Sequence, residues 1–430
     1  MIFALIVVPV LGLFFGVHRY LWCRLVRDTT TPGSRPRRAG TAALVVLPLL
    51  ALGALLAGRA GVPFLLQQVL AWPGYLWLAL VLYLVLGLLA GEVVRAVWLR
   101  VPARRKGRGP GDGRPATAGP SVPAPAPAPD APRAPAPSSA PTLLPPRTPA
   151  LPPLPAPPRR LFVARAVAAG ASLAATAAVG YGTATTLRGP VVKRVTVPLA
   201  KLPRSAHGFR IAVVSDIHLG PILGRAHTRR VVETINRTSP DLIAVVGDLV
   251  DGSVADLAAA AEPLRALRSR HGAYFVTGNH EYYSGAAPWV DHVRELGIHP
   301  LENARTELPG FDLAGINDLA GQTEHAGPDY ERALGGRDPA RAVVLMAHQP
   351  VTIHETVRHG VDLQLSGHTH GGQMWPFTYV AAATNPTVAG LARYGDTQLY
   401  VTRGAGAWGP PVRLGAPPDV TVVELASLRA

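Results

Sequence analysis

The stretch Ile211-Ala212-Val213-Val214-Ser215-Asp216-Ile217-His218 is the starting point for interpreting this chain. It begins with a short run of apolar, mostly β-branched residues, which predicts a buried β-strand. The run ends in Asp216 and His218, two residues apart on an extended chain. Binding sites in open α/β sheets form beyond the carboxyl ends of strands. We therefore expect Asp216 and His218 to lie on a loop at the edge of a sheet.

The same pattern occurs four more times along the chain. Each time, an apolar run that predicts a strand is followed by an Asp, Asn or His. The four runs are 241–248, ending in Asp248; 273–281, ending in Asn279, His280 and Glu281; 342–348, ending in His348; and 361–370, ending in His368 and His370.

Charge and histidine are unevenly distributed over the 430 residues. Residues 1–187 hold 19 Lys and Arg against 4 Asp and Glu, whereas residues 188–430 hold 23 of each. Nucleic-acid-binding domains carry their positive charge on the folded domain, so this distribution argues against a nucleic-acid partner. The single Cys23 excludes an intrachain disulfide and a cysteine-based zinc site. Of the 14 histidines, 13 follow residue 200, which indicates a metal or acid–base site in the C-terminal part.

Three apolar segments near the N-terminus predict transmembrane helices. They cover residues 2–17, 41–57 and 69–90, close to the length of about 20 residues that crosses a bilayer. Arginine is frequent before the second segment and after the third, and positive residues stay in the cytoplasm. We therefore predict a membrane region over 1–101 with its N-terminus outside.

A proline-rich stretch separates this region from the remainder. Residues 102–160 hold 20 of the 44 prolines, with Ala between them, which predicts a disordered linker. Residues 161–187 are weakly apolar and follow Arg159-Arg160. This segment resembles a twin-arginine signal anchor, an ordinary fourth transmembrane helix is an alternative, and a soluble Ala-rich helix is a third. The first two interpretations predict a multi-pass protein of the cell membrane with an extracytoplasmic C-terminal domain.

Residues 188–430 alternate predicted strands and helices, and the strands then come closer together. This order suggests a layered α/β sandwich. The expected helices cover 224–238 and 254–268, and the later strands cover 311–316, 342–347, 361–366, 398–402 and 420–425.

The strand endings supply a donor set that suits divalent metal ions. Carboxylates, imidazoles and one amide oxygen favour manganese, iron or zinc. Seven donors are too many for one tetrahedral ion but suit two ions that share a carboxylate. Such a pair, about 3.5–4 Å apart, clamps a phosphoryl group and turns a bridging water into hydroxide. His280 is placed as a general acid or charge stabiliser. The candidate ligands are Asp216, His218, Asp248, Asn279, His348, His368 and His370.

These blocks resemble the signature of the calcineurin-like metallophosphoesterases, in matching order over about 205–427. The ending at 401–418 is similar to the membrane-associated bacterial branch of that family. The resemblance implies a four-layer α/β/β/α sandwich, here preceded by an all-α transmembrane region. It also implies that one metal binds Asp216, His218, Asp248 and His370, and that the other binds Asp248, Asn279, His348 and His368.

We therefore expect a membrane-tethered phosphoesterase that hydrolyses a phosphomonoester or phosphodiester, with a phospholipid or other lipid-linked envelope substrate. No protein partner is implied. The alternative is a metal-binding envelope scaffold with little turnover.

Four other residues keep two interpretations each. Asp251 either supports a metal ligand or is an exposed loop carboxylate. Glu281 either orients His280 or begins a helix. Trp375 and Trp408 either wall an apolar groove or pack in the interior, and packing is the preferred interpretation.

Overall fold

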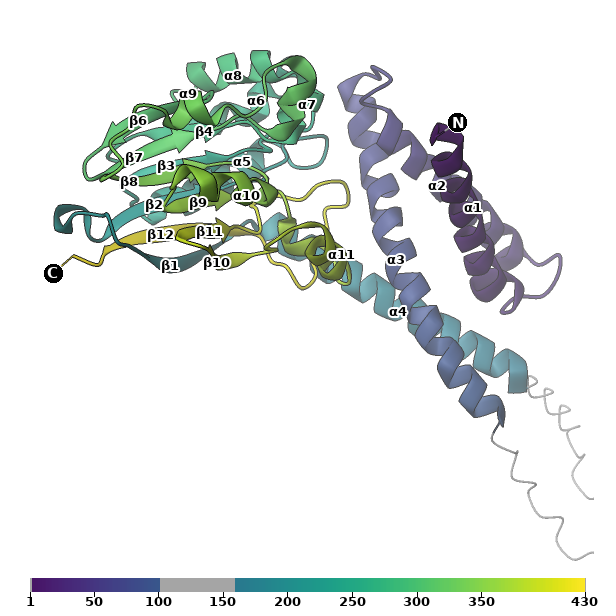
Figure 1. Ribbon diagram of the computed structural model, residues 1–430. Coiled ribbons are helices and arrows are strands. Elements are labelled where there is room, and N and C mark those ends of the chain that lie inside the picture. Colours follow the sequence, from purple (N-terminus) through teal and green to yellow (C-terminus); the bar gives the residue numbers. More distant parts are fainter. Residues whose placement is uncertain (1, 101–158, 430) are drawn as a thin grey trace, which may run out of the picture.

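The computed structural model describes residues 2–100 and 159–429. The predicted linker lies outside these residues, apart from its last two positions, which begin helix α4. The described chain forms a group of long helices and an α/β domain, and helix α4 leads directly into the first strand of that domain (Figure 1).

The four predicted apolar segments each lie in a long helix, apart from Ala57 at the end of the second segment, which follows the last residue of α2. Within the described chain, three helices are long and apolar enough to cross a membrane, over 35–56, 64–98 and 159–188. Their apolar side chains pack together with those at the end of α1. The helices are α1 Ile2–Leu21, α2 Arg35–Leu56, α3 Phe64–Arg100 and α4 Arg159–Arg188, with a short π-helical segment at Trp22–Arg27.

Opposite ends of these helices have different surroundings. At one end, the Arg24 side chain contacts Glu92 at 2.7 Å, and Arg165 donates to the carbonyl of Thr29 at 3.0 Å. At the other end, Phe64 packs against the interior of the α/β domain. Figure 1 shows the start of α3 and the end of α4 beside that domain, with the linker ends of both helices far from it.

The α/β domain contains two six-stranded mixed sheets. The first has the order β1-β12-β2-β3-β4-β5 and the second β10-β11-β9-β8-β7-β6. The bounds in the first sheet are β1 Val191–Leu199, β2 Phe209–Val214, β3 Leu242–Val246, β4 Ala273–Val276, β5 His299–Pro300 and β12 Asp419–Ser427. Those in the second are β6 Ala304–Leu308, β7 Phe311–Gly315, β8 Ala342–Met346, β9 Leu363–Ser366, β10 Gly390–Tyr394 and β11 Thr397–Val401.

Helices cover the outer faces of both sheets. Helices α5, α6 and α8 pack on the first sheet, and α9 packs on the second. The domain is therefore the four-layer α/β/β/α sandwich expected from the sequence. The helix bounds are α5 Arg225–Arg237, α6 Val254–Ala261, α7 Asn279–Ser284, α8 Ala286–Glu295, α9 Tyr330–Leu334, α10 Ile353–Thr356 and α11 Phe377–Thr384.

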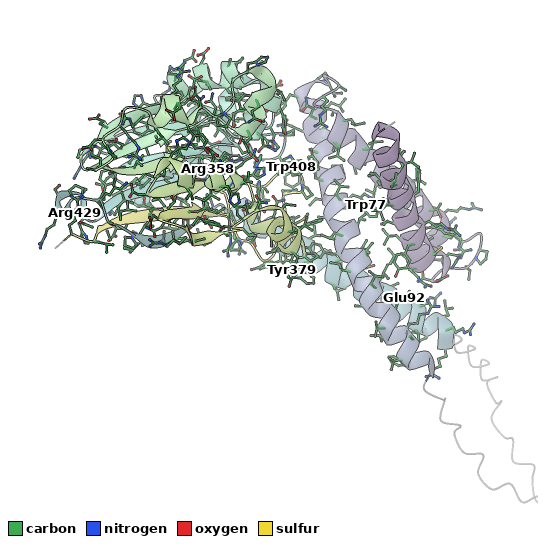
Figure 2. The ribbon with its side chains drawn as sticks, in the orientation of Figure 1. Trp77, Glu92, Arg358, Tyr379, Trp408 and Arg429 are labelled. Carbon is green, nitrogen blue, oxygen red and sulfur yellow. The ribbon has the colours of Figure 1, made fainter. Side chains whose placement is uncertain are left out.

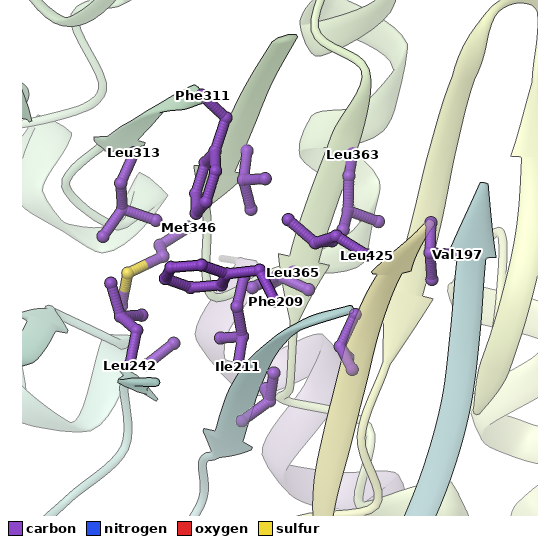
Figure 3. Close-up of a cluster of buried hydrophobic side chains, with 14 of the residues drawn as sticks. Val197, Phe209, Ile211, Leu242, Phe311, Leu313, Met346, Leu363, Leu365 and Leu425 are labelled. Carbon is purple, nitrogen blue, oxygen red and sulfur yellow. The ribbon is translucent and has the colours of Figure 1, made fainter. Parts of the chain in front are cut away.

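The side chains that fill the space between the two sheets come from alternate positions along each strand. On β2, Ile211 and Val213 face the second sheet, whereas Ala212 and Val214 face the helices. Figure 3 shows Phe209 and Ile211 of β2 among side chains from β7, β8 and β9, such as Phe311.

The parallel strands bring the polar endings together. Strands β2, β3 and β4 run parallel in the first sheet, and β7, β8, β9 and β11 run parallel in the second. Their carboxyl ends lie at one edge of the sandwich, where the loops of the two sheets meet: after β11 of the second sheet, Ala405 N–H donates to the carbonyl of Ser215, and Gly406 N–H to that of Asp216, both in the loop after β2.

Candidate metal centre

Five residues at the strand ends adopt left-handed backbone conformations. Their φ angles are 50° at Asp216, 48° at His218, 52° at Asp248, 72° at His368 and 53° at His370. Such values are uncommon outside glycine and cost conformational energy that the surrounding structure must offset. Strain of this kind gathers at functional sites, and here it falls on five of the seven predicted ligands.

Backbone hydrogen bonds hold these loops in place. The loops after β2 and β3 are joined by a hydrogen bond from His218 N–H to the carbonyl of Asp248, 3.2 Å long. The N–H of His368 donates to both carboxylate oxygens of Asp216 at 3.0 Å, which links the two sheets. The site is therefore rigidly supported by the ends of both sheets.

Asp216, His218 and His370 form the first group of donor atoms. The Nε2 atoms of His218 and His370 lie 3.0 Å apart, and Nε2 of His370 lies 3.3 Å from Oδ1 of Asp216. All three side chains are buried or nearly so. Three donor atoms facing one another at such short range can share one cation.

Asp248, His348 and His368 form the second group. The Nε2 atom of His348 lies 3.1 Å from Oδ2 of Asp248. Nδ1 of His368 lies 3.0 Å from Oδ1 of Asn279, which adds the predicted amide donor to this group.

Asp248 lies between the two groups. Its Oδ2 atom is 3.1 Å from Nε2 of His348 and 3.7 Å from Nε2 of His218. Its Oδ1 atom accepts the N–H of His280 at 2.9 Å, which fixes the orientation of the carboxylate. All seven side chains predicted as ligands thus meet in one cluster, with Asp248 between the two groups.

Histidine tautomers provide a test of whether this cluster suits a metal. Nδ1 of His348 lies 2.8 Å from the carbonyl of Val246, which can only accept, so Nδ1 carries the proton. In the neutral ring, Nε2 then directs a lone pair at the Asp248 carboxylate, and it is buried without a hydrogen-bond partner. Either a proton on Nε2 or a metal ion between the two atoms removes this conflict, and a neutral imidazole beside a carboxylate is a donor pair that fits a metal ion.

Asp251 supports the site from outside the two groups. Its carboxylate lies 3.1 Å from Nδ1 of His218 and 2.6 Å from Nδ1 of His280. Because a carboxylate accepts at Nδ1, the Nε2 atom of each ring is directed at the site. Of the two interpretations of Asp251, the contact with His218 favours support of a candidate ligand over an exposed loop carboxylate.

The cluster also requires positive charge. Burial lowers the pKa of His218, but Asp251, Asp248 and Asp216 outweigh it and raise the pKa to about 9. Burial likewise opposes the charged form of His348, and Asp248 nevertheless raises its pKa well above the usual value. In the protein without metal, protons on these rings compensate the buried carboxylates, and bound cations take over that role.

Two histidines are kept neutral, as metal ligands must be. Burial, followed by the charge of His348, lowers the pKa of His368 to about 4. Burial, His218 and Arg413 hold the pKa of His370 well below its usual value.

His280 lies at the rim of the cluster rather than inside it. Its Nε2 atom is 4.0 Å from Oδ2 of Asp248, and its side chain is 15% exposed. Its ring packs against Tyr283 and Trp408, with centroids 5.4 Å and 5.7 Å away. This location gives it access to a substrate while Asp251 orients it.

Glu281 has the second of its two expected roles. It does not orient His280 but lies in the first turn of α7, and its buried carboxylate accepts the N–H of Gly278, just before the helix, at 2.6 Å. The same carboxylate also accepts the N–H groups of Asp248 and Leu249 at 3.0 and 2.7 Å, a role that was not predicted. It therefore ties the loops after β3 and β4 together, and burial, followed by Asp248, raises its pKa to about 7.

Arg413 is almost fully buried beneath the site. It donates to the carbonyls of His370, Arg403 and Gly406 at 2.9, 2.7 and 2.8 Å. The sequence gives one indication of its importance, because Arg413 is the one charged residue in the block 404–418. No spacing in the sequence links it to His370.

The fold and the donor cluster define a metallophosphoesterase-type domain, and comparisons with known proteins agree. The calcineurin-like phosphoesterase family matches residues 209–372. A transmembrane protein with metallophosphoesterase domain from Danio rerio is 39% identical over 259 residues, covering 57% of this chain and 59% of that protein. The uncharacterized metallophosphoesterase YkuE of Bacillus subtilis is 32% identical over 276 residues, covering 61% of this chain and 94% of that protein.

The chain belongs to the calcineurin-like phosphoesterase family. It spans about three fifths of the length of its transmembrane relatives from Danio rerio and Bos taurus. A crystal structure of a dimetal phosphatase from Danio rerio is also similar, with a TM-score of 0.34 at 15% identity over 46% of this chain and 88% of that one.

Proposed function

We propose that the protein is a membrane-tethered phosphoesterase that uses two divalent metal ions to hydrolyse a phosphomonoester or phosphodiester. The observation that carries the proposal is the position of Asp248 between two groups of donor atoms, 3.1 Å from His348 and 3.7 Å from His218. A carboxylate in that position suits a shared ligand of two ions.

Each ion is assigned four ligands in this proposal. Manganese, iron and zinc all suit such oxygen and nitrogen donors. When bound, a pair of ions neutralises the charge of a phosphoryl group and generates a strong nucleophile at neutral pH. One ion is assigned to Asp216, His218, Asp248 and His370, and the other to Asp248, Asn279, His348 and His368.

His280 is proposed as the residue that assists the leaving group. Asp251 accepts at its Nδ1 atom, so Nε2 is directed away from that contact and toward the site. A histidine there can donate a proton to the leaving oxygen or stabilise its negative charge.

The helices suggest where the substrate is found. Basic residues gather at the end of the helices that lies far from the α/β domain, which the positive-inside rule assigns to the cytoplasm. We therefore propose four transmembrane segments, with the fourth over 161–187, and a domain at 188–430 outside the cytoplasm. A lipid-linked or other envelope phosphate ester is the substrate that suits this location.

Hydrolysis of p-nitrophenyl phosphate and bis-p-nitrophenyl phosphate by the full chain in nanodiscs tests the activity. We expect turnover with at least one of manganese, iron and zinc, and none for Asp248→Asn. Two bound metal ions without turnover on either ester or on phospholipids would instead favour an envelope-binding protein.

Protease treatment of intact cells tests the orientation. We expect the protease to digest residues 188–430 from outside. Protection of these residues until the cells are opened would contradict the proposed orientation.

A further inference from the structure

Helix α11 is apolar and yet exposed. None of its eight residues is buried. Trp375 just before it is 49% exposed, and within it Phe377, Tyr379 and Val380 are 43%, 70% and 57% exposed. Residues 371–392 contain no Asp, Glu, Lys or Arg, although the domain around them is rich in charge. Such a surface is unfavourable in water and indicates a partner that covers it.

The segment just before α11 is attached to the transmembrane helices. Met374 packs in the same apolar cluster as side chains of α3 and α4. The N–H of Trp375 donates to the carbonyl of Leu414 at 2.9 Å, and the N–H of Arg413 donates to the carbonyl of Gly182 in α4 at 3.0 Å. Figure 1 shows α11 beside α4, at the end of the domain that faces the helices.

The length of helix α4 gives the depth at which this surface meets a bilayer. Arg165 of α4 contacts Thr29 in the loop at the basic end of the helices. Gly182 lies about 17 residues further along α4, or about 26 Å at 1.5 Å per residue. The hydrocarbon core of a bilayer is about 30 Å thick, so Gly182 reaches its opposite boundary.

Helix α3 gives the same level independently. Glu92 contacts Arg24 at the basic end of the helices. Tyr75 lies about 17 residues earlier in α3, again about 26 Å away. Its ring is next to Gly409, where an added Cβ would lie 4.0 Å from it. The segments around residues 374 and 409 therefore both lie at the bilayer boundary.

We propose that Trp375, helix α11 and Trp408 form an interfacial platform that inserts into the outer surface of the lipid bilayer. Tryptophan and tyrosine favour this boundary, where their rings meet both lipid and water, and the helix supplies apolar area without charge. Trp408 is 58% exposed, and Figure 2 places it where the domain meets the helices. The occupant of the patch is thus lipid.

The platform adjoins the candidate metal centre. The rings of Trp408 and His280 lie 5.7 Å apart. Gln373 fixes the Trp408 loop, because its Oε1 atom accepts the N–H of Trp408 at 3.0 Å and its Nε2 atom donates to the carbonyl at 3.0 Å. The inference rests on the proposed function and extends it: a phosphate ester can keep its apolar chain in the bilayer while its headgroup reaches the site laterally.

Site-directed spin labelling of the full chain in nanodiscs of phosphatidylcholine and phosphatidylglycerol tests the platform. The chain has one cysteine, Cys23, so a Cys23→Ser background permits a single label. Labels are introduced by Tyr379→Cys, by Val380→Cys as a second platform site, and by Arg429→Cys as the control. Figure 2 shows Arg429 at the opposite end of the domain. All three side chains are exposed, so the substitutions leave the packing intact.

We expect the labels at 379 and 380 to be severalfold more accessible to oxygen, and severalfold less accessible to a water-soluble nickel chelate, than the label at 429. Equal nickel accessibility at all three sites would overturn the proposal. So would spin–spin broadening between two copies at 379, because a second chain would then cover the patch. Accessibility is measured without substrate, and p-nitrophenyl phosphate hydrolysis by the same samples reports separately on the proposed function.

Discussion

The Oδ2 atom of Asp248 lies 3.1 Å from Nε2 of His348, a buried ring nitrogen. The other nitrogen of that ring faces the carbonyl of Val246. Without a metal ion, a proton on Nε2 of His348 compensates the carboxylate, and a bound cation would take the place of that proton.

Asp248→Asn removes the carboxylate proposed to serve both ions. We expect fewer than two bound metal ions per chain and a fall in phosphoesterase activity larger than the roughly 10- to 100-fold that loss of an outer-sphere partner costs. Metal analysis after dialysis and hydrolysis of p-nitrophenyl phosphate measure both. Asp241→Asn, at the start of the same strand, is the matched control, since Asp241 contacts Arg210 rather than the site. Full metal content in Asp248→Asn would contradict the proposed bridge.

Asp251→Asn removes the acceptor that orients two histidines. His218 and His280 both direct Nδ1 at this carboxylate. We expect metal affinity and activity to fall by roughly 10- to 100-fold. The number of metal ions bound per chain is expected to return to the parent value at high metal concentration. Titration with manganese, followed by activity, measures this. Asp256→Asn is the control on the neighbouring helix, where the carboxylate accepts the hydroxyl of Ser253. Equal metal affinity in the two variants would show that Asp251 has no orienting role.

The strand endings could be predicted from the sequence because each is a local pattern. Asp216 and His348 follow apolar runs, and the parallel arrangement of such strands brings their ends to one edge. The support of these residues could not be predicted in this way. Glu281 accepts N–H groups of Asp248 and Leu249, more than 30 residues earlier, and Arg413 reaches His370 from the far end of the chain. Those contacts depend on how loops meet in three dimensions.

The preference for interior packing of the two tryptophans was wrong. Trp375 and Trp408 are 49% and 58% exposed. Helix α11 was also not predicted, because its Ala- and Thr-rich sequence has no amphipathic period. Apolar side chains are assigned to the interior when water is taken as the only solvent. The exposure becomes understandable only once the structure puts these residues beside helices that are apolar and long enough to cross a membrane.

Gly182→Ala tests the attachment of the domain to helix α4. An added Cβ would lie 2.4 Å from Cγ1 of Val412 and 3.2 Å from the backbone nitrogen of Arg413, so the loop must move. Alanine favours a helix over glycine by about 1 kcal/mol, but overpacking costs about 1–3 kcal/mol. Because Arg413 contacts His370, we expect a severalfold loss of metal affinity, measured by manganese titration.

Gly180→Ala is the matched control, two residues away in the same helix. An added Cβ there meets no atom within 4 Å. We expect this variant to keep the parent metal affinity and to gain slightly in thermal stability. The same affinity in both alanine variants would mean that the contact at Gly182 does not position the loop.

His227 in helix α5 gives a prediction for pH dependence. Both of its ring nitrogens are buried and have no hydrogen-bond partner among residues 2–100 and 159–429. Burial, followed by the charges of Arg230 and Arg413, lowers its pKa from 6.5 to about 3. The unfolded chain therefore binds a proton below pH 6.5 that the folded chain excludes. The contribution of neutral His227 to the free energy of unfolding is therefore fully present above pH 6.5. It is lost as the pH falls from there toward 3, by at most about 1.4 kcal/mol per pH unit.

His227→Leu removes this contribution. We expect the free energy of unfolding in detergent, followed by pulse proteolysis in urea, to depend less steeply on pH between 6.5 and 4 than in the parent. Near pH 7 the variant is expected to be at least as stable, because leucine buries no unpaired polar atoms. His354→Leu replaces an exposed histidine and is expected to retain the parent slope. An unchanged slope in His227→Leu would show that His227 does not stay neutral in the folded protein.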